Sequence, residues 1–140
     1  MEPTLLHVGV YLFLIKNKKL LYLHKPNDPI WTCLGGRMSE DEIFPTETLS
    51  RESIEEIGTN DLDIKDIFDI RVWSNGKSKR LGIFYYGYLK DENFKIKLSE
   101  EHDKYNFFTY GQAKVMLSQE ERGKVGIELI NKLPQLNLIN

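Results

Sequence analysis

Apolar residues in the first quarter of the chain fall in short blocks bounded by polar residues, which is the pattern of β-strands. We predict strands over residues 7–15 and 19–24, joined as a hairpin by a polar Lys-Asn-Lys segment. Residues 25–30 carry two prolines around Asn-Asp and are predicted to form a loop. A short strand over residues 31–34 should then run into a tight turn at Gly35-Gly36.

A helical pattern follows the polar loop 37–44. Pro45 suits the first turn of a helix, and Gly58 is the residue type that commonly follows a helix end. We therefore predict a helix from Pro45 to Ile57. Its inward stripe recurs at every fourth position and comprises Leu49, Ser53 and Ile57, with Ile54 at its edge.

The second half of the chain alternates strand and helix patterns. The predicted strands are residues 62–73 and 80–89, around an Asn75-Gly76 turn signal, with an edge strand over 94–98 and a short strand over 107–109. The predicted helices are 112–117 and 120–133, the latter ended by Pro134. Strands on both sides of a central helix, with a helix at the C-terminus, favour an α/β/α layered domain with a mixed sheet. The chain length of 140 residues predicts one domain over 1–140.

The composition argues against several classes of function. The net charge of −2 argues against a nucleic-acid or membrane-surface protein, since both are normally basic. The single cysteine, Cys33, rules out an internal disulfide and is typical of a reducing cytoplasm. The apolar run 8–15 has neither a basic segment before it nor a cleavage site after it, and it is too short to span a bilayer. We therefore expect a cytoplasmic monomer or homodimer with no membrane or nucleic-acid partner.

Three carboxylates cluster on the predicted helix. Glu52, Glu55 and Glu56 stand at i, i+3 and i+4, so they share one face and repel one another. They also lie near the helix C-terminus, where the helix dipole disfavours negative charge. A divalent cation would turn this arrangement into a binding site, because Mg²⁺ takes oxygen ligands. The alternative is a solvated acidic helix face.

The residues around this cluster resemble the Nudix box of MutT-like Nudix hydrolases, GX5EX7REUXEEXGU, with U an aliphatic residue. Seven fixed positions match, namely Gly36, Glu42, Arg51, Glu52, Glu55, Glu56 and Gly58. Three features depart from the pattern. The spacer between Glu42 and Arg51 has eight residues instead of seven, and we place the extra residue near Phe44-Pro45; Ser53 and Thr59 replace aliphatic residues.

The resemblance implies a Nudix-type α/β/α sandwich that carries a Nudix loop and helix. It also implies a pyrophosphohydrolase that uses Mg²⁺ or Mn²⁺ and cleaves a nucleoside diphosphate linked to another group X. By resemblance, the metal ligands are Glu52, Glu55, Glu56 and the carbonyl of Gly36, with Glu42 as an auxiliary member. Arg51 would orient Glu55 through an i,i+4 ion pair; a direct contact with phosphate is the alternative.

The general base has several candidates. Glu55 or Glu56 could activate the water. In some Nudix enzymes the base lies in a loop after the box, and the segment 99–102 resembles their Glu-His pattern, with Glu101 the first candidate there and Glu100 the second. A solvated acidic loop is the competing interpretation, and we interpret His102 as a structural residue.

Candidate substrate contacts come from basic and aromatic residues near the predicted sheet. Arg37, Arg71 and the pair Lys79–Arg80 are candidates for phosphate, and Trp31, Phe84, Tyr86 and Tyr105 for stacking on a base, with core packing as the alternative. Sequence markers of the ADP-ribose, NADH and coenzyme A enzymes are absent. A nucleoside or deoxynucleoside triphosphate, or a related nucleotide, is therefore the expected small-molecule substrate, and a diadenosine polyphosphate is the next alternative. A non-catalytic nucleotide sensor is a further alternative, disfavoured because all box glutamates are present.

Overall fold

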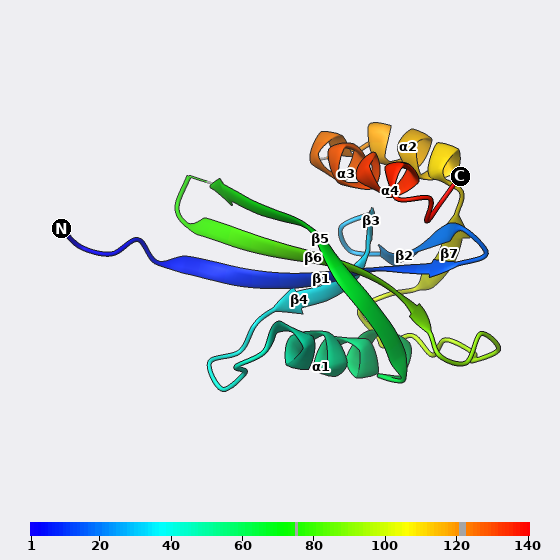
Figure 1. Ribbon diagram of the computed structural model, residues 1–140, viewed down its shortest axis with the longest axis horizontal. Coiled ribbons are helices and arrows are strands. Elements are labelled where there is room, and N and C mark those ends of the chain that lie inside the picture. Colours follow the sequence, from blue (N-terminus) through cyan, green and yellow to red (C-terminus); the bar gives the residue numbers. More distant parts are fainter. Residues whose placement is uncertain (75, 121–122) are drawn as a thin grey trace.

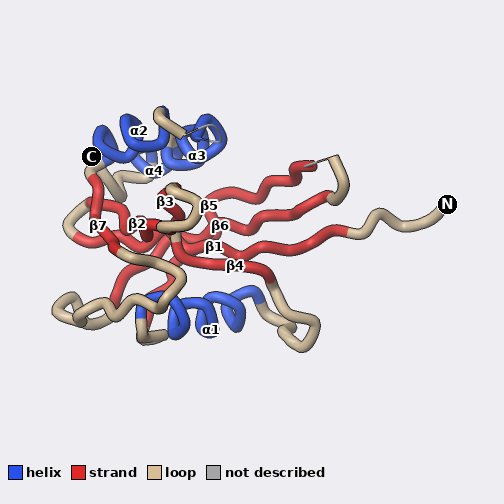
Figure 2. Tube along the Cα trace, turned by 180° about the vertical axis from the view of Figure 1, so that it is seen from behind, coloured by secondary structure: helices blue, strands red, loops and turns tan. Residues whose placement is uncertain are grey.

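Two helical layers enclose a mixed β-sheet (Figure 1). The structure, a computed structural model, describes residues 1–74, 76–120 and 123–140. Helix α1 (Pro45–Ile57) covers one face of the sheet, and α2 (Tyr110–Ser118), α3 (Gly123–Ile130) and α4 (Lys132–Gln135) gather on the other. Figure 2 shows the same layers from behind, with the strands between the helices. The predicted α/β class with a mixed sheet is confirmed.

The sheet is built around the long first strand. The strands are β1 (Leu6–Lys16), β2 (Lys19–Lys25), β3 (Ile30–Thr32), β4 (Leu34–Arg37), β5 (Leu62–Ser74), β6 (Lys79–Leu89) and β7 (Lys104–Phe108). Their order is β3-β2-β1-β6-β5, while β4 also pairs with β1 and β7 with β2. Strands β1 and β6 are parallel, and the other pairs are antiparallel.

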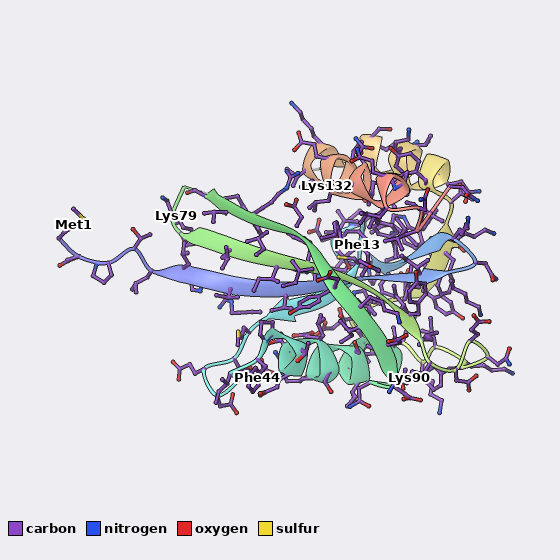
Figure 3. The ribbon with its side chains drawn as sticks, viewed as in Figure 1. Met1, Phe13, Phe44, Lys79, Lys90 and Lys132 are labelled. Atoms are coloured by element: carbon purple, nitrogen blue, oxygen red, sulfur yellow. The ribbon has the colours of Figure 1, made fainter. Side chains whose placement is uncertain are left out.

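Alternation along β1 divides the core into two apolar clusters. Val10, Leu12 and Leu14 lie in the cluster beneath α1, whereas Phe13 and Ile15 belong to the cluster beneath α2, α3 and α4. Figure 3 shows Phe13 between the sheet and these three helices. The hydrophobic effect therefore holds a helical layer on each face of the same strand.

Helix α1 has the predicted bounds. Its C-terminus is closed by Gly58, which adopts the left-handed conformation at φ 85° and donates its N–H to the carbonyls of Ser53 and Ile54. Leu49 and Ile57 are fully buried against the sheet. This packing fixes which face of the helix points outward.

Three sequence predictions are wrong in detail. Residues 94–98 form no strand, because the N–H of Lys97 bonds to the Ile57 carbonyl at the end of α1 and not to a sheet edge. Gly35-Gly36 is not a turn, since both residues lie within β4. The C-terminal helix divides into α3 and α4, and Pro134 lies inside α4, where the first turn needs no N–H donor.

The remaining predicted elements differ mainly at their ends. Strand β7 begins three residues before the predicted 107–109, and α2 extends beyond 112–117 at both ends. In the predicted Asn75-Gly76 turn, Asn75 lies outside the described residues and Gly76 has a φ of 91°. None of the described helices is long and apolar enough to cross a membrane.

One end of the sheet extends past both helical layers. Strands β1, β5 and β6 project together on the side of the N-terminus, and Lys79 marks the tip of this projection (Figure 3). Ile70 and Val72 of β5 are more than half exposed there. The projecting part of β5 therefore exposes the apolar side chains of this face to solvent.

The buried hydroxyl of Ser53 should lower the stability of the fold. Ser53 is fully buried on the inner face of α1, and its hydroxyl has no hydrogen-bond partner among the described residues. We predict that Ser53→Ala raises the free energy of unfolding by about 1 kcal/mol, because an unsatisfied buried hydroxyl is removed. In a domain of this size that corresponds to a rise of about 3–5 °C in the thermal midpoint.

The matched control is Thr48→Val on the same helix. Thr48 is equally buried, but its hydroxyl donates to Glu42 at 3.0 Å. Loss of this hydrogen bond in Thr48→Val should lower the thermal midpoint by a similar amount. If both substitutions shift the midpoint in the same direction, the difference between a paired and an unpaired hydroxyl is not what governs stability here.

Candidate active site

The guanidinium of Arg51 is the centre of a network that joins α1 to the preceding loop and to β4. Its Nε donates to Glu42 at 3.1 Å, its Nη1 to Glu52 at 2.8 Å, and its Nη2 to the carbonyl of Arg37 at 2.8 Å. Glu55, the predicted i,i+4 partner, is more distant at 3.7 Å. Arg51 therefore orients Glu42 and Glu52 more directly than Glu55.

Glu42 lies inside this network despite the longer spacer before Arg51. It accepts hydrogen bonds from the Ser39 amide at 2.8 Å and from the Thr48 hydroxyl at 3.0 Å. The hydrogen bond from Arg51, helped by that from Ser39, lowers the pKa of Glu42 to about 2. A carboxylate that accepts so many hydrogen bonds is ionised near neutral pH, and these bonds attach the loop to α1.

The Glu52 carboxylate lies directly against the backbone of β4. A Cβ built on Gly36 would stand 2.6 Å from the Glu52 carboxyl carbon, so any side chain at position 36 would displace that carboxylate. Burial raises the pKa of Glu52, although the hydrogen bond from Arg51 works in the opposite direction. The glycine thus permits a carboxylate and a strand backbone to share one small space.

Glu56 is the most buried carboxylate of the box, with 8% of its side chain exposed. It accepts a hydrogen bond from the Gly35 amide at 2.9 Å. Burial raises its pKa to about 8, and the neighbouring charges of Glu52 and Glu101 act in the same direction. A buried carboxylate in this setting would be favoured in its ionised form by a bound cation.

His102 faces Glu56 from the loop after β6. Its side chain is fully buried, its Nε2 is 3.9 Å from Glu56 Oε2, and neither ring nitrogen has a hydrogen-bond partner in the described part of the chain. Burial lowers the pKa of His102, which keeps the ring neutral near pH 7. A neutral imidazole ring therefore lies beside the Glu56 carboxylate in the protein interior.

The same loop brings Glu101 toward the box. Its negative charge raises the pKa of both Glu52 and Glu56. Asp103 anchors the loop to β2 through a 2.7 Å contact with the His24 ring. An acidic side chain from a distant part of the sequence is therefore added to the carboxylates of α1.

These oxygen donors suit a hard divalent cation. Glu52 and Glu56 supply carboxylates at the same end of β4, and Gly36 leaves room for close approach to the backbone. In the residues described, no three His, Cys, Asp or Glu side chains already converge as a metal cluster. Glu52 and Glu56 are held instead by Arg51 and by the Gly35 amide.

The predicted substrate residues separate into two groups. Arg37 is exposed at the end of β4, beside Gly36. Trp31 is half-buried on β3, where its ring contacts His24 and Phe108 and its amide donates to Glu120 at 2.9 Å. Arg37 therefore adjoins the box through Gly36, whereas Trp31 packs against the apolar cluster beneath α2, α3 and α4.

The other candidates are committed to internal contacts. Arg71 forms 2.7 Å ion pairs with Asp69 and with Glu128 of α3, so its guanidinium is neutralised. Tyr86 is half-buried and packs against the cluster under α2, α3 and α4. These contacts make Arg71 and Tyr86 parts of the sheet–helix junction.

Several residues of the site were not found by sequence reasoning. Ser39 and Thr48 hold Glu42, and Gly35 holds Glu56. The spacing of Ser39 and Glu42, three residues apart, is a known hydrogen-bonding signature that could have revealed the first contact. The contact between Gly35 and Glu56 has no such signal, because it depends on the docking of α1 onto β4.

Comparison with known proteins identifies the class. Residues 5–128 match the NUDIX domain family. Among solved structures, a MutT protein from Methanosarcina mazei is 22% identical, with a TM-score of 0.77 and coverage of 98% of this chain and 99% of that one. A Caenorhabditis elegans Ap4A hydrolase is 18% identical, with a TM-score of 0.71 and coverage of 93% and 99%. The Escherichia coli dihydroneopterin triphosphate pyrophosphohydrolase is 18% identical, with a TM-score of 0.61 and coverage of 83% and 86%. No curated protein matches the sequence.

The chain belongs to the NUDIX domain family. It is a Nudix hydrolase, an enzyme that acts on pyrophosphate bonds. Members of this family typically use a divalent metal ion and small nucleotide-type substrates.

The network around Glu42 predicts a specific acid sensitivity. Its folded-state pKa of about 2 lies below the ordinary value of 4.5, so its contribution to stability is present above pH 4.5 and is lost as the pH falls toward 2. We predict that Glu42→Gln lowers the free energy of unfolding at pH 7 and flattens its decline over this acid range. Urea unfolding of metal-free protein at several pH values measures both effects.

Glu40→Gln is the control, since Glu40 is exposed in the same loop. It should follow the wild-type dependence on pH. A Glu42→Gln protein whose stability still falls with acid as steeply as that of the wild type would contradict the assignment.

Proposed function

We propose that this Nudix hydrolase cleaves a nucleoside or deoxynucleoside triphosphate, or a related nucleotide, with Mg²⁺ or Mn²⁺ held by Glu52, Glu56 and the carbonyl of Gly36. The observation that carries the proposal is that the Glu52 carboxylate occupies the space a side chain at Gly36 would fill, with buried Glu56 beside Gly35. The carboxylates lie close together there, which is unfavourable because they repel one another and are partly removed from water. A bound divalent cation would offset that cost, polarise phosphate oxygens and lower the pKa of a water molecule.

Each residue of the chain then has a defined role. Arg51 is a positioning residue, because its donors are engaged by Glu42, Glu52 and a backbone carbonyl. Glu55 is exposed at the outer edge of the site, and we retain it as a further carboxylate for metal or water. Glu101 is the proposed acceptor of the water proton, since it approaches the box from a separate loop.

The proposed reaction is a substitution at phosphorus. A water oxygen forms a new bond to one phosphorus atom, and the bridging P–O bond of the anhydride breaks. The departing phosphate keeps the bridging oxygen with its electron pair, and the water proton passes to the acidic side chain. For a nucleoside triphosphate cut between the α- and β-phosphates, the products are a nucleoside monophosphate and pyrophosphate.

A diadenosine polyphosphate is the second candidate substrate. The relatives of similar fold include proteins named for Ap4A and for dihydroneopterin triphosphate, so the fold accommodates both classes. Arg37 is exposed beside Gly36 and would bind a phosphate of either one. The products distinguish the two, because only a dinucleotide yields two nucleotides.

We predict that turnover requires a divalent cation and depends on Glu56. Hydrolysis of a panel of nucleoside triphosphates and diadenosine tetraphosphate would be followed by separating the nucleotide products, with Mg²⁺, with Mn²⁺ and with excess chelator. Glu56→Gln should reduce turnover by about 10²-fold or more, because it removes one charged oxygen donor from the metal site. Its fold should persist, since burial of the carboxylate is unfavourable.

Glu40→Gln again serves as the control and should retain wild-type turnover. Full activity in chelator would refute the metal requirement. Near wild-type turnover by Glu56→Gln on the best substrate would show that the box carboxylates are not the catalytic centre.

A further inference from the structure

His102 is a fully buried histidine whose ring has no hydrogen-bond partner. Its side chain is shielded from solvent, and neither Nδ1 nor Nε2 is paired in the described part of the chain. A buried polar atom of this kind destabilises the folded state, because its hydrogen bond to water is lost and not replaced. An apolar side chain would fill the same space without this loss. Packing alone therefore does not account for a histidine here.

The backbone on both sides of His102 fixes the place of the ring. The His102 amide donates to the Ser99 carbonyl at 3.3 Å, and the Asp103 amide donates to the His24 carbonyl of β2 at 3.1 Å. The Asp103 carboxylate also contacts the His24 ring at 2.7 Å. The loop is therefore held against β2, which keeps the imidazole in the interior next to Glu56.

Glu56 offers the imidazole one of its two carboxylate oxygens. Its Oε1 accepts the hydrogen of the Gly35 amide at 2.9 Å, whereas its Oε2 lies 3.9 Å from His102 Nε2. The second distance is about 1 Å longer than an N–H···O hydrogen bond. A neutral imidazole carries hydrogen on one ring nitrogen, and on Nε2 this hydrogen faces the carboxylate. A small movement of either side chain would therefore complete a hydrogen bond.

A metal ion at the box would strengthen this contact. Glu56 bound to a cation is held as a carboxylate, and a hydrogen bond to an ionised acceptor in the interior is stronger than one to a neutral acceptor. Residues that hydrogen-bond to a metal-binding carboxylate fix its orientation, and their loss typically weakens metal binding by about 10- to 100-fold. His102 stands in this relation to Glu56.

We propose that His102 is a positioning residue of the metal site, whose Nε2–H donates to the Glu56 carboxylate when a divalent cation is bound. The inference rests on the proposed function, because it assumes that Glu56 is a metal ligand. The histidine stays neutral and takes no proton in the reaction. Its unpaired ring gains a partner when the cation binds, which favours the metal-bound protein over the metal-free one.

Binding of Mn²⁺ to the metal-free protein, without any nucleotide, tests this inference. Isothermal titration calorimetry gives the dissociation constant of each variant. His102→Leu should weaken Mn²⁺ binding by about 10- to 100-fold, because the donor to Glu56 is removed. The same substitution should not lower the thermal midpoint of the metal-free protein, since two unpaired nitrogens leave the interior. A histidine needed only for packing would give the reverse result, a lower midpoint with unchanged affinity.

Two amide variants test the position of the donor. The side chain in His102→Gln can place an N–H near the position of Nε2, whereas the shorter one in His102→Asn reaches only the position of Nδ1. His102→Gln should therefore bind Mn²⁺ within about threefold of the wild type, and His102→Asn about tenfold more weakly or worse. Because the two variants have the same functional group, this comparison also decides the matter if His102→Leu fails to fold.

His7→Leu is the matched control. His7 is an exposed histidine of β1, so the same chemical change there should leave Mn²⁺ binding unchanged.

The outcomes separate this inference from the proposed function. Wild-type Mn²⁺ affinity in His102→Leu would overturn it and leave the proposed metal site standing. Equal affinities of His102→Gln and His102→Asn would also overturn it, because the position of the donor would then have no effect. Absence of Mn²⁺ binding by the wild type would overturn both. The expected order of affinities, together with hydrolysis of no nucleotide, would support the role of His102 and count against the proposed reaction.

Discussion

A single guanidinium holds together the acidic half of the site. Arg51 bonds to the loop through Glu42, to its own helix through Glu52, and to β4 through the Arg37 carbonyl. Without this cation, the carboxylates of α1 would face each other and the loop with no counter-charge in contact. Arg51 thus adds a polar link between α1 and β4 to their apolar packing, beside the hydrogen bond from the Gly35 amide to Glu56.

The sheet separates this network from a second, aromatic surface. Strand β4 carries the glycines that admit the box carboxylates, and its neighbour β1 carries Gly9 and Tyr11 on the opposite face. The two faces of the same strands therefore present different chemistry, with oxygen donors beside α1 and aromatic rings with the arginines Arg37 and Arg80 on the other side. Substitution of Gly36 would disturb the first, and substitution of Gly82 would disturb the second.

The sequence predicted the parts of the fold that local patterns determine. The bounds of α1 followed from Pro45, Gly58 and the four-residue apolar repeat, because capping and amphipathic burial are local effects. Residues 94–98 were mistaken for a strand, since alternation alone does not reveal whether a partner strand is available. Gly35-Gly36 was mistaken for a turn, because glycine within a strand that closely approaches a helix has the same local signature.

The residues of the candidate site were predictable from the sequence to about the same extent as the fold. The repulsion among neighbouring carboxylates and the spacing of the box identified Glu52, Glu56 and Arg51 as candidate site residues, since these residues are close in sequence. The partners of Arg71 come from its own strand and from α3, so its engagement depends on tertiary packing that a single sequence does not encode visibly. The shared face of Tyr11 and Trp73 was not predictable for the same reason, because only the strand register brings them together.

The position of a bound metal ion tests the account most directly. Crystals grown with Mn²⁺ would locate the ion by its anomalous scattering. The account predicts an ion bound by Glu52, Glu56 and the Gly36 carbonyl, with metal–oxygen distances of about 2.1 Å, near those of Mg²⁺. An ion found away from these three groups, with Glu52 still bonded to Arg51 and Glu56 still bonded to the Gly35 amide, would contradict it.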